Sequence, residues 1–175
     1  MIEKYKPDMY MKNIYEIDYK KLKNMGIKCI LFDLDNTLVP FNVKFPSRKI
    51  KDIIERIKDK GFKVIIFSNS SKSRLKPFKD KLEVDCAYSC RKPSTYKFKK
   101  ILNLYKYNES QVAIIGDQLV ADILGGNKCG IYTILVDPIQ KKEFIFTKFN
   151  RMIEKVIYKK FKNKNILKKG NYYES

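Results

Sequence analysis

Apolar residues follow two different periods along this chain, and together they predict strands alternating with helices. Short continuous apolar runs, which are typical of buried strands, occur within residues 27–33, 62–67, 86–89, 111–115 and 131–136. The segments between these runs place apolar residues at helical spacing. The clearest helix can be capped by Ser47, and its apolar side is formed by Ile50, Ile53, Ile54 and Ile57.

The remaining segments complete an α/β pattern. We expect a short helix ending near Gly26, a basic helix over residues 72–82 distorted at Pro77, a helix from after Pro93 to about residue 104, and a helix over residues 119–124 that stops at Gly125-Gly126. The predicted fold is a Rossmann-like five-stranded, mainly parallel sheet with helices on both faces. The chain divides into an N-terminal lead-in (1–26), a core (27–143) and a basic amphipathic helix with a tail (144–175).

Composition limits the possible classes of protein. A chain of 175 residues with 44% hydrophobic residues is long and apolar enough for one folded domain. No apolar run approaches the roughly 18 residues that span a bilayer, and the first ten residues lack a signal-peptide apolar region. We therefore expect a cytoplasmic protein whose four cysteines are reduced. The absence of histidine excludes histidine-dependent catalysis and histidine metal sites.

The formal charge of +19 permits two interpretations. A strongly basic surface attracts nucleic acid and anionic lipid. However, 33 of the 38 basic residues are lysine and only three residues are alanine, which is also typical of a proteome from an A+T-rich genome. The charge alone does not choose between a specific partner and this compositional bias.

The first candidate site follows the first predicted strand and reads Phe-Asp-Leu-Asp-Asn-Thr-Leu, residues 32–38. Asp33 and Asp35 are two positions apart, so an extended backbone directs them to one side. Asp33 is placed to attack phosphorus, Asp35 to protonate the leaving oxygen and then activate water, and Thr37 to hold the loop. The alternative is a turn that the Asp35-Asn36 pair merely caps.

Two further candidates follow the second and third predicted strands. Ser68 and Asn69 offer a hydroxyl and backbone N–H groups to a phosphoryl oxygen. Lys92, in Arg91-Lys92-Pro93, offers a positive charge to both the phosphate and Asp33. Each of these signals is common by itself, and Lys92 is one of many lysines.

The fourth candidate is Gly116-Asp117, followed by Asp122 about one helical turn later. Asp33, Asp117, Asp122 and the Asp35 segment, through its backbone carbonyl, can supply oxygen ligands to Mg²⁺. The metal would offset the repulsion between carboxylate and phosphate. The alternative for Asp117 is a helix cap, but four motifs at strand ends in one α/β pattern favour an active site.

These four motifs in this order resemble the haloacid dehalogenase (HAD) superfamily of phosphatases. Further segments resemble its YqeG family, the subclass IIIA group related to mitochondrial phosphatidylglycerophosphate phosphatase; they read Gly-Asp-Gln-Leu (116–119), Gly-Gly-Asn (125–127), Val-Asp-Pro-Ile (136–139) and Thr-Lys-x-Asn-Arg (147–151). The resemblance covers about residues 5–160 and implies a HAD core, Mg²⁺ dependence and the roles given above. One departure is Ala121, where the pattern leads us to expect threonine before the aspartate.

Spacing predicts an open site. One helix and one strand nearly fill each of the intervals from Thr37 to Ser68 and from Ser68 to Lys92, which leaves no room for a cap domain. An open site suits a phosphate that is carried by something large.

In the C-terminal helix, apolar residues alternate with lysines. This helix could therefore either lie on an anionic membrane or dock on the core. Its apolar residues are Phe146, Phe149, Ile153, Val156, Ile157 and Phe161.

The resulting hypothesis is a Mg²⁺-dependent phosphomonoesterase that forms an aspartyl-phosphate. By resemblance, its substrate is phosphatidylglycerophosphate, at the inner face of a membrane. The alternatives are a phosphatase for a soluble phosphosugar, nucleotide or phosphoprotein, and a basic module that binds RNA or ribosomes.

Overall fold

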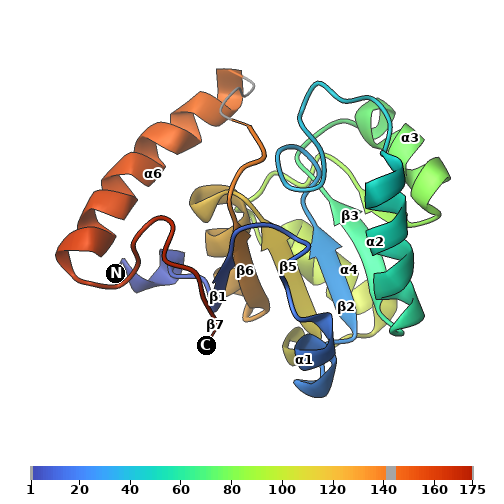
Figure 1. Cartoon of the computed structure of the whole chain (residues 1–175), viewed down its shortest axis with the longest axis horizontal. Coiled ribbons are helices and arrows are strands. Elements are labelled where there is room, and N and C mark those ends of the chain that lie inside the picture. Colours follow the sequence, from blue (N-terminus) through green and yellow to red (C-terminus); the bar gives the residue numbers. More distant parts are fainter. Residues whose placement is uncertain (1, 141–144, 175) are drawn as a thin grey trace.

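A seven-stranded sheet forms the centre of the protein in the computed structural model, which describes residues 2–140 and 145–174 (Figure 1). The strand order is β4-β3-β2-β5-β6-β1-β7, and every neighbouring pair is parallel except β1 and β7. The strands are β1 (Met9–Met11), β2 (Cys29–Phe32), β3 (Lys63–Phe67), β4 (Asp85–Ala87), β5 (Val112–Gly116), β6 (Tyr132–Val136) and β7 (Tyr173–Glu174).

Helices connect the parallel strands. The α-helices are α1 (Tyr19–Asn24), α2 (Arg48–Asp59), α3 (Lys72–Leu82), α4 (Tyr96–Tyr105), α5 (Leu124–Cys129) and α6 (Ile145–Asn163). Two 3-10 turns, Glu3–Tyr5 and Glu109–Gln111, and a π-helical turn, Leu119–Ile123, complete the set. None of the described helices is long and apolar enough to cross a membrane.

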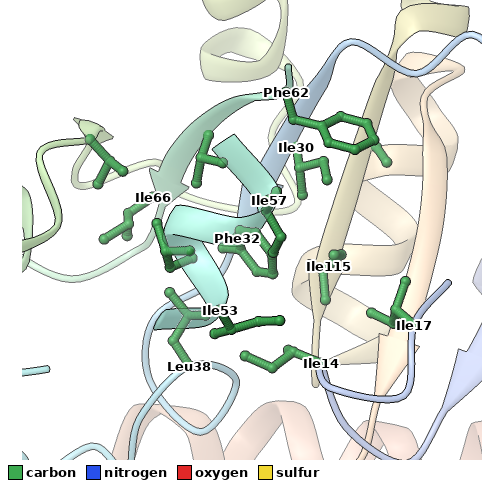
Figure 2. Close-up of a cluster of buried hydrophobic side chains, with 14 of the residues drawn as sticks. Ile14, Ile17, Ile30, Phe32, Leu38, Ile53, Ile57, Phe62, Ile66 and Ile115 are labelled. Atoms are coloured by element: carbon green, nitrogen blue, oxygen red, sulfur yellow. The ribbon is translucent and has the colours of Figure 1, made fainter. Parts of the chain in front are cut away.

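Alternating side chains of the strands divide the core between the two faces of the sheet. On one face, Ile30 and Phe32 of β2 pack under α1, α2 and α3, and Figure 2 shows Ile53 and Ile57 of α2 gathered around Phe32. On the other face, Leu31 packs with residues of α4 and α5. The buried side of α2 consists of the four isoleucines expected, and Ser47 accepts the capping bond from the N–H of Ile50.

The C-terminal helix α6 covers the end of the second face, beside β6 and β1, and Figure 1 shows it on the side of the molecule away from α2 and α3. Its buried residues Ile157 and Phe161 contact a cluster that includes Tyr10 and Leu135. One side of this helix therefore docks on the core.

Two expectations about the elements change. The structure adds β1 and β7 to the five predicted strands, and β1 joins residues 9–11 to the main sheet through Met9↔Ile134 pairing. The prediction that a helix stops at Gly125-Gly126 is wrong, because α5 continues to Cys129. These glycines permit close packing: a Cβ on Gly126 would lie 2.6 Å from Thr133 Cγ2, and one on Gly125 would lie 2.9 Å from Phe98 Cε2.

The expected absence of a cap domain is confirmed for residues 33–92, all of which the structure describes. The regular elements of this part are α2, β3, α3 and β4, and the segment between β2 and α2 is a short loop with one bridge, Asp35↔Val39.

Candidate active site

The predicted site residues meet at the carboxyl-terminal edge of the sheet. Asp33 follows β2, Ser68 follows β3 and Asp117 follows β5. These three strands are parallel neighbours, and Phe32 is in register with both Ile66 and Ile115, so their ends lie at the same level. Side chains at this edge are in the position where open α/β sheets hold their ligands.

Lys92 connects two of the carboxylates. Its Nζ donates to Asp33 Oδ1 at 2.7 Å and to Asp122 Oδ1 at 2.6 Å, and a third bond goes to the carbonyl oxygen of Phe67 at 3.0 Å. All three ammonium protons thus have acceptors, and the side chain is only 2% exposed. A buried lysine with this set of partners is fixed in place as a point charge beside Asp33.

Asp122 reaches Lys92 because of the backbone around it. It lies in the π-helical turn that follows β5, and its Oδ2 accepts a bond from the backbone N–H of Gln118 at 3.1 Å. Gly116 passes so close that a Cβ there would lie 2.2 Å from the Asp122 carboxyl carbon. Glycine at position 116 is therefore a steric requirement of this site.

Asp117 is held from two sides. The Thr37 hydroxyl donates to Asp117 Oδ1 at 3.3 Å and lies 3.4 Å from Asp33 Oδ2. From α6, Arg151 forms an ion pair with Asp117 Oδ2 and donates to its backbone oxygen at 2.9 Å. Arg151 is oriented in turn by the buried Glu154, whose Oε2 lies 2.7 Å from its Nη1.

Burial dominates the electrostatics of these groups. It raises the pKa of Asp33 to about 7, even though the Lys92 ammonium opposes the shift. It also raises the pKa of Asp117 well above the ordinary value, against the effect of Arg151. Burial works against the charge of Lys92 as well, but Asp122 and Asp33 hold its pKa above the ordinary value.

The donor set fits a hard divalent cation. Asp33, Asp117 and Asp122 each offer a carboxylate oxygen, and these oxygens all lie within 4.8 Å of one another. When ionised, these three groups and Glu154 carry four negative charges, whereas Lys92 and Arg151 supply two positive ones. A divalent cation would balance the difference, and carboxylate oxygens are the ligands that Mg²⁺ prefers.

Asp35 lies outside this cluster of carboxylates. Its Oδ1 accepts bonds from Arg74 Nη2 at 2.8 Å and Nε at 3.2 Å, and its Oδ2 accepts one from the Ser70 hydroxyl at 2.6 Å. Asn36 has a φ of +64°, so the chain turns immediately after Asp35. The sequence predicts both aspartates on one side of an extended segment; in the structure Asp35 is bound by Arg74 and Ser70, yet it is close enough to Asp33 for its charge to add to the rise in the pKa of Asp33.

Ser68 and Asn69 have different surroundings. Ser68 is buried, and its hydroxyl oxygen accepts a bond from the backbone N–H of Ser70 at 3.1 Å, which leaves the hydroxyl proton to donate. Asn69 holds the Lys92 backbone instead, with Oδ1 accepting from its N–H at 2.7 Å and Nδ2 donating to its oxygen at 3.4 Å. Asn69 therefore connects the loops that carry Ser68 and Lys92.

The sequence assigns no site role to Arg74, Arg151 or Glu154, although Arg151 ends the Thr-Lys-x-Asn-Arg segment that carries part of the family resemblance. A usable signal exists in the composition, since only five residues of the chain are arginine. Arginine is distinguished from lysine by its planar fork of donors, which suits contacts with two acceptors. In a chain that otherwise uses lysine, two of the five arginines contact candidate site residues.

This fold and this edge of carboxylates define a hydrolase of the HAD class. A family model described as haloacid dehalogenase-like hydrolase matches residues 30–92, and one described as HAD-hydrolase-like matches residues 89–138. The solved D,D-heptose 1,7-bisphosphate phosphatase of B. bronchiseptica, complexed with magnesium and phosphate, has a similar fold with a TM-score of 0.51 and 19% sequence identity, over 62% of this chain and 80% of the other.

Within that class, the chain belongs to the YqeG family of phosphatases. It is 37% identical to the probable phosphatase YqeG of Bacillus subtilis over 90% of this chain and 92% of the relative. It is also 27% identical to the chloroplastic/mitochondrial phosphatidylglycerophosphate phosphatase 1 of Arabidopsis thaliana. That match covers 83% of this chain and 45% of the relative's length.

Proposed function

We propose that this phosphatase is Mg²⁺-dependent, forms an aspartyl-phosphate on Asp33, and acts on phosphatidylglycerophosphate. The observation that carries the catalytic part is the contact of Asp33 with Lys92 inside a cluster of buried carboxylates at the sheet edge. A fixed carboxylate beside a fixed cation is what a nucleophile for an anionic ester needs, because the cation offsets the repulsion between carboxylate and phosphate.

In the proposed first step, an oxygen of Asp33 forms a bond to phosphorus while the bond from phosphorus to the ester oxygen breaks. Asp35 gives that oxygen a proton, and the alcohol leaves. In the second step, water attacks the phosphoryl group, Asp35 takes up a proton from the water, and inorganic phosphate leaves with Asp33 regenerated. To donate a proton, Asp35 has to carry one and to turn from its contact with Arg74.

The other side chains bind and orient. Lys92 keeps its positive charge against Asp33 and the incoming phosphate, and the Ser68 hydroxyl has its proton to donate to a phosphoryl oxygen. The ligands for Mg²⁺ would be Asp33 and Asp117, the backbone carbonyl near Asp35, and Asp122. When bound, Mg²⁺ supplies the positive charge that favours the ionised form of the carboxylates and neutralises the phosphate.

The lipid substrate is supported by the likeness to the Arabidopsis enzyme and by the open site. Residues 33–92 contain no inserted cap domain, which favours access of a phosphate at the surface of a micelle or bilayer to the sheet edge. A phosphate presented by a large body needs no enclosing pocket around the rest of the substrate.

The test is Mg²⁺-dependent phosphate release from phosphatidylglycerophosphate in mixed micelles, beside p-nitrophenyl phosphate and with Asp33→Asn as a control. Faster release from the lipid, lost in Asp33→Asn, is the expected result. Release from the soluble ester alone would contradict the lipid substrate and keep the catalytic proposal. Release that persists in Asp33→Asn would contradict the nucleophile.

A further inference from the structure

One side of α6 carries apolar residues that do not contact the core. Phe149, Met152 and Val156 are 67%, 65% and 55% exposed. They are three and four positions apart, so they form one stripe along the helix. We call these three residues the outer stripe. It runs along α6 beside the row of residues that packs on the core, Ile153, Ile157 and Phe161, and it is turned toward solvent.

Exposed lysines accompany the outer stripe, namely Lys155, Lys159, Lys160 and Lys162. The only acidic residue of α6 is Glu154, which is buried and paired with Arg151. The described solvent-facing side of α6 from residue 149 onward therefore combines large apolar side chains with positive charge and carries no negative charge. This combination is the one that lies at the interface of an anionic bilayer, with lysines at the headgroups and apolar side chains among the acyl chains.

We propose that the outer stripe of α6 docks on a bilayer that contains anionic phospholipid. The proposal rests on the function proposed above in that a lipid substrate requires the enzyme to meet a membrane. Charge disfavours a second copy of the chain as the occupant, because two molecules of formal charge +19 repel each other. Nucleic acid is disfavoured because base stacking uses aromatic and arginine side chains, and two of the three stripe residues are aliphatic.

The same helix is fixed to the active site. Arg151 binds Asp117, and Asn150 Nδ2 donates to the Gln118 side chain at 3.1 Å, so the start of α6 is held against the loop that follows β5. Phe149 directly precedes Asn150 and Arg151 in the sequence. A bilayer bound along the outer stripe would therefore lie close to the carboxylate cluster, and the docking surface and the open site would serve the same membrane.

The test is co-sedimentation of the full chain with vesicles of phosphatidylcholine alone or mixed with phosphatidylglycerol, over a series of salt concentrations. The stripe variant combines Phe149→Ser, Met152→Ser and Val156→Ser. The matched control combines Tyr96→Ser and Leu104→Ser on α4, which are 68% and 65% exposed and lie outside the stripe. We expect wild type and control to bind the mixed vesicles, and the stripe variant to bind them at least about tenfold more weakly.

Lysine substitutions separate the two contributions. Lys155→Gln with Lys159→Gln should weaken binding at low salt by about fivefold per charge and should flatten its salt dependence. Equal binding by wild type and the stripe variant would overturn the proposal, since charge alone would then explain the attraction. No binding by wild type, or a dimer in light scattering that the stripe variant dissociates, would also overturn it.

Activity distinguishes this proposal from the catalytic one. The stripe variant should hydrolyse p-nitrophenyl phosphate at the wild-type rate, because none of its residues contacts the carboxylate cluster. Asp33→Asn should bind the mixed vesicles as wild type does. Full activity of Asp33→Asn would therefore contradict the catalytic proposal while leaving the docking surface intact.

Discussion

Replacing Lys92 by methionine removes the charge at the centre of the site while nearly preserving the length of the side chain. In the wild type, the Lys92 ammonium contacts Asp33 at 2.7 Å, Asp122 at 2.6 Å and the Phe67 oxygen at 3.0 Å. The variant leaves two buried carboxylates with neither this cation nor these hydrogen bonds. Breaking a buried pair by removing one partner costs about 3–5 kcal/mol, and the 2% exposure of Lys92 makes this range applicable.

Protonation limits the size of that loss. A buried carboxyl can escape the penalty by taking up a proton, at a cost of about 1.4 kcal/mol for each pH unit above its ordinary pKa. The largest possible loss of stability from an unpaired carboxylate therefore falls as the pH is lowered. For Lys92→Met we expect to lose about 3–5 kcal/mol of unfolding free energy near pH 7.5, and about 1–3 kcal/mol less than that near pH 5.5.

The assay is urea unfolding in EDTA at both pH values, with Lys100→Met as the control. Lys100 is an exposed residue of α4, and its replacement should change the stability by less than about 0.5 kcal/mol. Added Mg²⁺ should restore part of the stability of Lys92→Met, because it replaces the missing positive charge. A loss below about 1 kcal/mol in EDTA near pH 7.5, or a loss that does not change with pH, would refute the reasoning.

Three further predictions concern the same site. Arg151→Gln should lower kcat on p-nitrophenyl phosphate about 10- to 100-fold because it frees Asp117, and Arg151→Lys should recover only part; full activity of the glutamine variant would contradict this role. Gly116→Ala should lower kcat at least about tenfold and cost about 1–3 kcal/mol of stability, because its Cβ would displace Asp122; unchanged kinetics and an unchanged urea midpoint would contradict the steric argument. The folded-state pKa of Asp33 is about 7, above its ordinary value, so the metal-free protein takes up a proton on folding. Its urea midpoint in EDTA should therefore rise as the pH falls from about 8 to about 6. A midpoint that falls over this range would contradict the predicted sign.

Local patterns in the sequence predicted most of the sheet and much of the site. Buried parallel strands are continuous apolar runs, and β2, β3 and β5 each end at a motif, so the sequence by itself predicts Asp33, Ser68 and Asp117 at one edge of the sheet. The position of Lys92 followed from the same order, although one lysine among 33 carries little information by itself.

The features that were missed depend on partners far away in the sequence. β1 and β7 contain three and two residues, too few for a period, and they exist because Met9 pairs with Ile134 and Tyr10 with Tyr173. The sequence predicts a helix stop at Gly126 because the local preference of glycine is a turn, whereas close packing of Gly126 against Thr133 accompanies a helix that continues.

Two arginines that contact the site were missed for the same reason. Arg74 lies 39 positions from Asp35, and Arg151 lies 34 positions from Asp117. No local pattern connects such pairs, and only the fold brings α3 and α6 to the sheet edge.

The most direct test of the account is to trap the phosphoryl group on Asp33. Asp35→Asn should slow the attack of water on the intermediate, so a single turnover with p-nitrophenyl phosphate and Mg²⁺, stopped with acid, should leave a phosphoryl adduct on the peptide that contains Asp33. The account predicts this adduct by mass spectrometry, and its absence when Asp33→Asn is combined with Asp35→Asn. An adduct on another residue, or a complete turnover without any adduct, would contradict it.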